Sequence, residues 1–197
     1  KDLCAYIAAG IHSDHECTTA AEALEKLRHG MFIAVREGTT ARDLEALLPA
    51  ITRDNSRRFF FCSDDRHPTT LVEEGHINAV VRKAIRLGMD PIRAIRLATV
   101  NATEFYGLHH LGAVAPGREA DLIVFDRFED LFIRLVFKSG RLVARDQKPL
   151  FESPPRRSKA NARGSVNIKW LEGDEFTLPA KGPRCRVIDL IPRQIVT

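Results

Sequence analysis

The sequence lacks any long uninterrupted hydrophobic run, although 44% of its 197 residues are hydrophobic. A membrane-spanning helix needs about 20 consecutive apolar residues, so we expect no membrane segment. The four cysteines form no C-x-x-C pair, which argues against a zinc ribbon or a disulfide framework and favours a reducing, cytoplasmic setting. The opening "KDLCAYIAAG" also lacks the charged and apolar regions of a signal peptide.

A strong excess of one charge is missing as well, because 30 Lys and Arg residues oppose 26 Asp and Glu residues, for a net charge of +4. The surplus gathers in "PPRRSKANARG". Proteins that bind single-stranded nucleic acid interleave such charges with aromatic rings, and this segment has none. We therefore interpret residues 149–164 as a solvated basic linker and expect no nucleic-acid partner. The basic residues concerned are Arg156, Arg157, Lys159 and Arg163.

Up to about residue 107, short apolar runs alternate with amphipathic stretches. "MFIAV" and "RFFFCS" predict strands, whereas "TTAAEALEKLRHG", "TTARDLEALLPA" and "TTLVEEGHINAVVRKAIRLG" predict helices. Strands that alternate with helices predict an α/β fold with a parallel sheet and right-handed crossovers. Polar residues that precede each helix are expected to cap it. These caps are Thr19, Thr40, Thr70, Asp90 and Asn101.

After Gly107 the pattern becomes rich in strands. "LGAVAPGREADLIVFD" and "FIRLVFKSGRLVARD" predict strands, and "KSGR" predicts a tight hairpin turn between two of them. We assign a small β module to residues 108–148. The last segment, residues 165–197, predicts strands that begin a further β domain.

Polar clusters follow the apolar lead of three successive expected strands. His12 to Glu16 follow the first, Arg36 and Glu37 the second, and Asp64 and Asp65 the third. The carboxyl ends of parallel strands meet at one edge of a sheet, where active sites form. Imidazole and carboxylate groups are the usual ligands of a hydrolytic metal, which lowers the pKa of bound water toward about 7. The pattern therefore indicates a metal site or an acid–base site.

Each cluster also has a purely structural interpretation. His15 could cap the helix that follows it, and Asp64 or Asp65 could be an N-cap or a partner of a helix dipole. Glu37 could be a solvated carboxylate where a strand ends. Cysteines beside the clusters fit small buried apolar roles better than chemistry. The residue pattern alone leaves these alternatives open.

Four segments carry a resemblance to a known family: "GIHSDHECTTAAEALEKLRHGMFIAVREG", "FFFCSDDRHPTTLVEEGHINAVVRKAI", "ATVNATEFYGL" and "LGAVAPGREADLIVFD". Together they resemble bacterial adenine deaminases, which are metal-dependent members of the amidohydrolase superfamily. The resemblance covers nearly the whole chain, and "SDHECTT" and "CSDDRHP" are its most specific parts. It implies that residues 1–107 form the C-terminal part of a (β/α)₈ barrel, followed by sandwich-type strands over residues 108–148. The lead into His12 would be the sixth barrel strand, with "MFIAV" and "RFFFCS" the seventh and eighth.

The resemblance also implies an activity and a cofactor. The reaction would be the hydrolytic deamination of adenine to hypoxanthine and ammonia, a step of purine salvage, with Mn or Fe(II) as the divalent metal and Zn as a third option. Which of the two adjacent aspartates binds the metal stays open. The implied roles are metal ligand for His15 and Asp64, catalytic proton transfer for Asp64, purine binding for Asp65 and Glu37, and support behind the ligands for His12 and Glu16.

The chain departs from this family in what it does not contain. The H-x-H pair of the first barrel strand is absent, as are the bridging carboxylate of the fourth strand and the ligand of the fifth. A complete barrel takes about 250 residues. We therefore expect a fragment that is inactive alone, unless a second copy or the remainder of the enzyme completes the barrel.

Two other functions compete with adenine deamination. Another amidohydrolase could act on a cyclic amide or amidine, although such enzymes usually carry a single aspartate where this chain has two. A non-catalytic fragment that binds nucleic acid through its basic linker is the third option, and a salt-dependent affinity would identify it.

Overall fold

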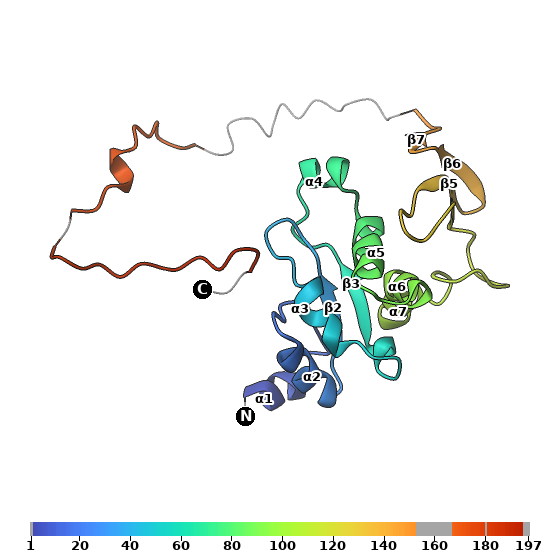
Figure 1. The fold of residues 1–197 in the computed structure, drawn as a ribbon, viewed down its shortest axis with the longest axis horizontal. Coiled ribbons are helices and arrows are strands. Elements are labelled where there is room, and N and C mark those ends of the chain that lie inside the picture. Colours follow the sequence, from blue (N-terminus) through green and yellow to red (C-terminus); the bar gives the residue numbers. More distant parts are fainter. Residues whose placement is uncertain (1, 153–166, 180, 195–197) are drawn as a thin grey trace. The chain divides into compact units, whose positions relative to one another are not determined.

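The computed structural model describes residues 2–152, 167–179 and 181–194 (Figure 1). The chain divides into two units, residues 1–150 with 190–197 and residues 151–189. The second unit contains a short 3-10 helix, η4 (Asp174–Phe176), and no strand in its described residues. The β domain expected over residues 165–197 and the boundaries between domains therefore stay predictions. The cluster from Arg156 to Arg163 lies outside the described residues.

A parallel sheet of three strands organises the first unit. The strands are β1 (Ser13–Asp14), β2 (Phe32–Arg36) and β3 (Phe59–Cys62), in the order β1-β2-β3. The pairing places Ser13 opposite Phe32 and Ile33 opposite Phe59. The predicted parallel α/β arrangement is confirmed for these strands.

Helices connect the strands and follow them. Helix α2 (Ala20–Arg28) joins β1 to β2, and α3 (Leu44–Leu47) joins β2 to β3 together with the 3-10 helices η1 (Leu48–Ala50) and η2 (Ser56–Arg58). Two predicted caps are confirmed, because the side chain of Thr19 accepts from the Glu22 amide at 3.3 Å and that of Asp90 accepts from the Arg93 amide at 2.9 Å. The helices after β3 are α4 (Pro68–Glu73), α5 (Ile77–Arg86), α6 (Pro91–Ala98) and α7 (Val100–Phe105).

The segment before His12 differs from the prediction. It was expected to be a barrel strand, but residues Asp2–Ala8 form helix α1, and β1 contains only Ser13 and Asp14. Alanine and leucine favour helix, and they supply three of the seven residues of this segment. The sheet order also places β1 at an edge, so it pairs with β2 on one side. The polar cluster thus contains the strand instead of following it.

Three predicted caps are wrong. Helix α3 begins after Asp43 and not after Thr40, and α7 begins after Thr99, so that Asn101 lies inside it. The stretch that contains Thr70 forms two helices instead of one, because Gly75 adopts a left-handed φ of +106° between them. In each case the polar side chain bonds to a distant segment of the chain instead of its own helix end.

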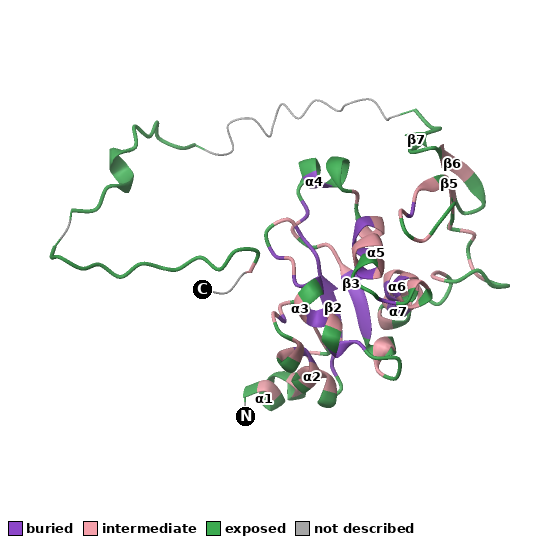
Figure 2. Cartoon of the chain, viewed as in Figure 1, coloured by how far each residue is buried: buried purple, intermediate pink, exposed green. Residues whose placement is uncertain are grey.

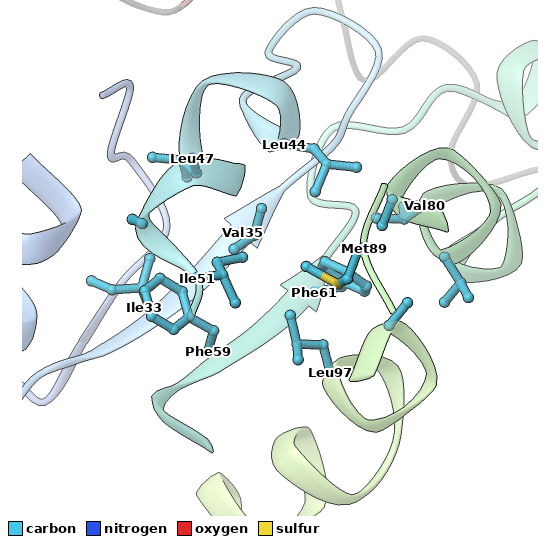
Figure 3. Packing of buried hydrophobic residues seen from close by; sticks show 14 of the residues in the cluster. Ile33, Val35, Leu44, Leu47, Ile51, Phe59, Phe61, Val80, Met89 and Leu97 are labelled. Carbon is cyan, nitrogen blue, oxygen red and sulfur yellow. The ribbon is translucent and has the colours of Figure 1, made fainter. Parts of the chain in front are cut away.

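The core lies on the face of the sheet that α3, α5 and α6 cover. Ile33 and Val35 of β2 and Phe59 and Phe61 of β3 point to this face, where Figure 3 shows them among residues of the helices. Figure 2 shows that both strands are buried along most of their length. The helix residues in this core are Leu44, Leu47, Val80 and Leu97. Full burial of one apolar side chain of this kind contributes about 1.5–3 kcal/mol.

Side chains on the opposite face of β2 and β3 are buried as well. Ala34 is 6% exposed and Phe60 is 3% exposed. The ring of Phe105 in α7 stacks on Phe60 with centroids 4.9 Å apart. Coverage of both faces explains why the strand sequences are continuously apolar.

The second sheet is antiparallel and has four strands. They are β4 (Leu122–Phe125), β5 (Ile133–Lys138), β6 (Arg141–Arg145) and β7 (Lys148–Pro149), in sequence order. Ser139 and Gly140 form the turn between β5 and β6 with φ values of +48° and +76°, as a two-residue hairpin turn with a left-handed pair requires. The predicted hairpin at "KSGR" is confirmed. Among the described helices, none is long and apolar enough to cross a bilayer.

Candidate metal and acid–base site

The carboxyl ends of the three parallel strands bring the predicted polar residues to one edge of the sheet. His15 and Glu16 follow β1, Arg36 is the last residue of β2, and Asp64 follows β3. Because the strands run in the same direction, residues that are 20 to 50 positions apart in sequence become neighbours there.

Three of these side chains bring nitrogen and oxygen atoms close enough together to share one ion. Nε2 of His15 lies 3.3 Å from Oδ2 of Asp64 and 3.0 Å from Oε1 of Glu16. One ligand atom from each residue lies within 4.8 Å of the others. The side chains are between one third and one half exposed, so an ion could reach them. Imidazole nitrogen and carboxylate oxygen suit a divalent transition metal, and the residues therefore fit such an ion.

A cavity of about 250 Å³ opens beside this cluster. Its wall combines the polar strand ends with apolar side chains from the face of the sheet opposite the core. The rings of Phe60 and Tyr106 meet edge to face there, with centroids 5.9 Å apart. The lining residues are Ser13, His15, Ala34, Phe60, Cys62, Asp64 and Tyr106.

Arg36 is the central cation of the site, a role that the sequence did not reveal. Its side chain is 8% exposed. Nη1 lies 3.0 Å from Oε1 of Glu16 and 3.1 Å from Oδ2 of Asp64, and Nη2 lies 3.2 Å from Oδ1 of Asp65. One guanidinium thus contacts carboxylates that follow both neighbouring strands, which offsets the repulsion between the adjacent aspartates.

The two aspartates face different surroundings. Asp64 lines the cavity beside His15, whereas Asp65 turns toward the loop between β2 and α3. There Oδ2 of Asp65 accepts from the amide of Thr40 at 2.7 Å and also from its hydroxyl. Burial alone would raise the pKa of Asp65, but the hydrogen bonds from Thr40 and Arg36 outweigh it and lower the pKa to about 2. Asp65 is therefore an anchored carboxylate.

Glu37 lies away from the cluster, in the protein interior. Its side chain is 4% exposed, and Oε1 lies 2.6 Å from Nζ of Lys83 on α5. Its Oε2 accepts from the amide of Leu44 at 3.3 Å, where α3 begins. Both oxygens are thus engaged within the protein, so its contacts do not support a purine-binding role.

His12 supports the sheet through its backbone. Its carbonyl accepts from the Phe32 amide at 2.8 Å, and its side chain is exposed. Glu16, expected behind the ligands, instead stands beside His15 among the three converging groups. The residue pattern did not predict this position, because it did not show where β1 ends.

A second group of ligand-type side chains comes from β1, the loop after it and α2. Asp14, Cys17 and Glu22 approach one another, but Nζ of Lys26 pairs with Asp14 and lies 2.6 Å from Glu22. Burial and the nearby Asp14 raise the pKa of the Cys17 thiol, and burial with Asp64 raises that of Cys62 to about 12. Both thiols stay protonated near neutrality, as expected for small buried residues without a chemical role.

The sequence of this chain matches the amidohydrolase family over residues 1–143. The chain therefore belongs to the amidohydrolase family, whose members are metal-dependent. This agrees with the N and O donors that converge at the edge of the sheet.

Curated relatives of this chain include adenine deaminases. The chain is 48% identical over 204 residues to an adenine deaminase of Petrotoga mobilis, an alignment that covers all of this chain and 35% of that protein. It is 46% identical over 197 residues to adenine deaminase 2 of Carboxydothermus hydrogenoformans, again with full coverage of this chain and 34% of that protein. The resemblance to adenine deaminases is confirmed. The chain spans about a third of the length of these curated relatives.

Solved structures support the same class of fold. An amidohydrolase of Thermotoga maritima superposes with a TM-score of 0.51 and 19% identity, over 68% of this chain and 37% of that one. A beta-aspartyl dipeptidase of Fervidobacterium islandicum superposes with a TM-score of 0.57 and 16% identity, over 72% and 41% of the two chains. At these identities the similarity concerns the fold alone, which is that of the amidohydrolases.

Proposed function

We propose that this chain is the part of an adenine deaminase that carries the last three strands of its barrel, and that the complete enzyme converts adenine and water to hypoxanthine and ammonia. The convergence of His15, Glu16 and Asp64 carries the proposal, because this cluster lies in a chain that is alike over its full length to proteins named adenine deaminase. In this arrangement β1, β2 and β3 are barrel strands six, seven and eight. The remainder of the enzyme supplies the other strands and the other metal ligands.

His15 and Asp64 hold the metal in this proposal. Their Nε2 and Oδ2 atoms are 3.3 Å apart, close enough to share one ion. A bound divalent metal lowers the pKa of coordinated water and makes a nucleophile available at neutral pH. Mn or Fe(II) is the expected ion, with Zn as the third option, since nitrogen and oxygen donors suit all three.

Asp64 moves the proton in the proposed reaction. Its Oδ2 contacts His15 and Arg36, whereas its Oδ1 has no hydrogen bond within the part of the chain that the structure describes. Oδ1 is therefore the oxygen that accepts a proton from the attacking water and passes it toward the departing amino group. General acid–base transfer of this kind contributes about 10²- to 10⁴-fold in rate.

The cavity gives a flat heterocycle an apolar wall beside polar groups. Phe60 and Tyr106 supply aromatic surface, and His15 and Asp64 stand at the same opening. Small-molecule sites commonly combine apolar walls with a few placed polar groups. A purine ring that lies against the aromatic wall would bring C6 toward the ligand cluster.

A substrate comparison with the intact protein that contains this chain tests the function. The metal content of the purified protein is first measured by elemental analysis. The protein is then supplied with Mn and incubated separately with adenine and with a dihydropyrimidine. We expect hypoxanthine and ammonia from adenine, no ring opening of the dihydropyrimidine, and Mn or Fe in the isolated protein. Hydrolysis of the cyclic amide without deamination of adenine would leave the family assignment intact and overturn the proposed substrate.

A further inference from the structure

Asp64 has an unusual backbone conformation for the residue that reaches into the cavity. Its φ is +41°, in the left-handed region that residues with a side chain seldom adopt. Such conformations persist where the surrounding structure holds them, and they gather at functional sites. Something next to Asp64 must therefore fix the turn after β3.

The neighbouring carboxylate of Asp65 is held from two directions. Its Oδ2 accepts from the amide of Thr40 at 2.7 Å and from the Thr40 hydroxyl. Its Oδ1 accepts from Nη2 and Nε of Arg36 at 3.2 and 3.4 Å. Both oxygens thus join the turn after β3 to the segment after β2. A purine would have to displace one of these donors to bond to Asp65.

The carboxylate of Asp65 occupies the space that a side chain on Gly38 would fill. A Cβ atom on Gly38 would lie 1.7 Å from Oδ1 of Asp65 and 3.2 Å from the carbonyl oxygen of Ala41. The backbone of Gly38 is not in the left-handed region, so the carboxylate, and not φ, requires glycine here. Only a residue without a side chain leaves room for Asp65 in its observed position.

Arg36 connects Asp65 to the cluster of His15, Glu16 and Asp64. The same guanidinium that binds Asp65 reaches Oδ2 of Asp64 at 3.1 Å and Oε1 of Glu16 at 3.0 Å. A shift of Asp65 would release one side of Arg36 and alter its contacts with both cluster carboxylates. A movement of Asp65 would therefore pass through Arg36 to Asp64 and Glu16.

We propose that Asp65 is a positioning residue: seated on Gly38 and held by Thr40 and Arg36, it fixes the left-handed turn that directs Asp64 into the cavity beside His15. This inference rests on the proposed function, in which Asp64 is a metal ligand. It assigns the two adjacent carboxylates to different tasks, with Asp64 facing the reaction and Asp65 facing the protein. Gly38 and Thr40 become parts of the site although neither lines the cavity.

Variants of the intact metal-loaded enzyme test this assignment. Gly38→Ala displaces the Asp65 carboxylate without removing a charge, and Thr40→Val removes one donor, whereas Thr40→Ser retains the hydroxyl. Gly182→Ala is the matched control, because a Cβ there meets nothing within 4 Å and the backbone is not left-handed. Asp65→Asn compares the residue directly. The readouts are the metal dissociation constant from chelator competition, and kcat and KM for adenine.

We expect Gly38→Ala, Thr40→Val and Asp65→Asn to weaken metal binding by about 10- to 100-fold, the range for groups that orient metal ligands. The rate constant kcat should fall with it, KM should change less than about threefold, and Thr40→Ser and Gly182→Ala should match wild type. Unchanged metal affinity with a raised KM in Asp65→Asn would overturn the proposal and make Asp65 a substrate contact. If Gly38→Ala does not fold, Thr40→Val against Thr40→Ser decides alone. Metal affinity is measured without adenine, so a wrong substrate leaves this test valid.

Discussion

Nζ of Lys83 lies 2.6 Å from Oε1 of Glu37 and joins helix α5 to the end of strand β2. The glutamate side chain is 4% exposed, whereas the lysine is 31% exposed and can turn toward water. A buried charge that loses its partner is costly, but an exposed one is not. The pair should therefore respond unequally to the loss of its two members.

Lys83→Met should destabilise the protein by about 3 kcal/mol, because it leaves Glu37 buried with only the amide of Leu44 as a partner. Glu37→Gln should cost less, since Lys83 can then be hydrated. Urea unfolding measures both, with Lys148→Met on the exposed strand β7 as the control. Equal costs for the two changes would contradict the predicted asymmetry, and a Lys83→Met variant as stable as the control would show that the pair does not support the fold.

Asp43 should make stability depend on pH near 5. Both of its carboxylate oxygens are buried without a hydrogen-bond partner in the described residues. Burial raises its pKa from the ordinary 3.8 to about 6, against the opposing charge of Arg36 and with help from Glu37. Because folded Asp43 binds its proton more tightly than the unfolded chain does, protonation of Asp43 favours folding. This stabilisation is complete below about pH 4 and is lost as the pH rises through about 6.

Asp43→Asn should therefore be more stable than wild type at pH 7, by about 3 kcal/mol, and the difference should vanish below pH 4. Denaturant unfolding at several pH values measures this, with the exposed Asp54→Asn as the control. A difference between variant and wild type that stays constant across this range would mean that Asp43 does not titrate near pH 5.

Asn101 should be a strong stabilising residue although it lies inside a short helix. Its amide nitrogen donates to the carbonyl oxygens of Ser56 and Phe59, both at 2.8 Å, and the residue is 3% exposed. Asn101→Ala removes both hydrogen bonds, although the Ser56 carbonyl still accepts from the Phe59 amide, and we expect a loss of about 1–3 kcal/mol. Thermal and urea unfolding report this loss. A cost no larger than that of Asn167→Ala, at an exposed position, would argue against the two hydrogen bonds.

The 197-residue chain by itself should not deaminate adenine. It places three ligand-type groups at the edge of a three-stranded sheet, whereas a closed barrel has eight strands. The measurement is hypoxanthine formation by the purified, Mn-loaded chain, next to the intact protein at equal concentration. Turnover by a monomer of this chain would contradict the expectation, whereas turnover only after the remaining segment is added would support it.

Local signals in the sequence predicted elements whose ends are fixed locally. Thr19 and Asp90 cap the helices that follow them, and Ser139 and Gly140 form the expected turn. Thr40 is different: it looks like a cap, but its donors serve Asp65, 25 positions away. A contact of this length leaves no trace in the spacing of neighbouring residues.

In the candidate site, too, the position of a strand end could be predicted from the sequence, but contacts between distant segments could not. The ends of β2 and β3 predicted where Asp64 would lie, because parallel strands end at a common edge. The different surroundings of Asp64 and Asp65 could not be predicted, since they depend on the space above Gly38 and on the reach of Arg36. An arginine at a strand end has the pattern of a solvated residue, and only its 8% exposure reveals a buried cation.

The decisive measurement is adenine turnover by the intact protein and its Asp64→Asn variant, with Asp54→Asn as the control and Mn present throughout. We expect hypoxanthine formation by wild type and control, and a kcat lower by about 10²- to 10⁴-fold in Asp64→Asn, because an amide at this position cannot take up the proton that the carboxylate accepts. An Asp64→Asn variant that deaminates adenine at the wild-type rate would show that Asp64 neither holds the metal nor moves the proton.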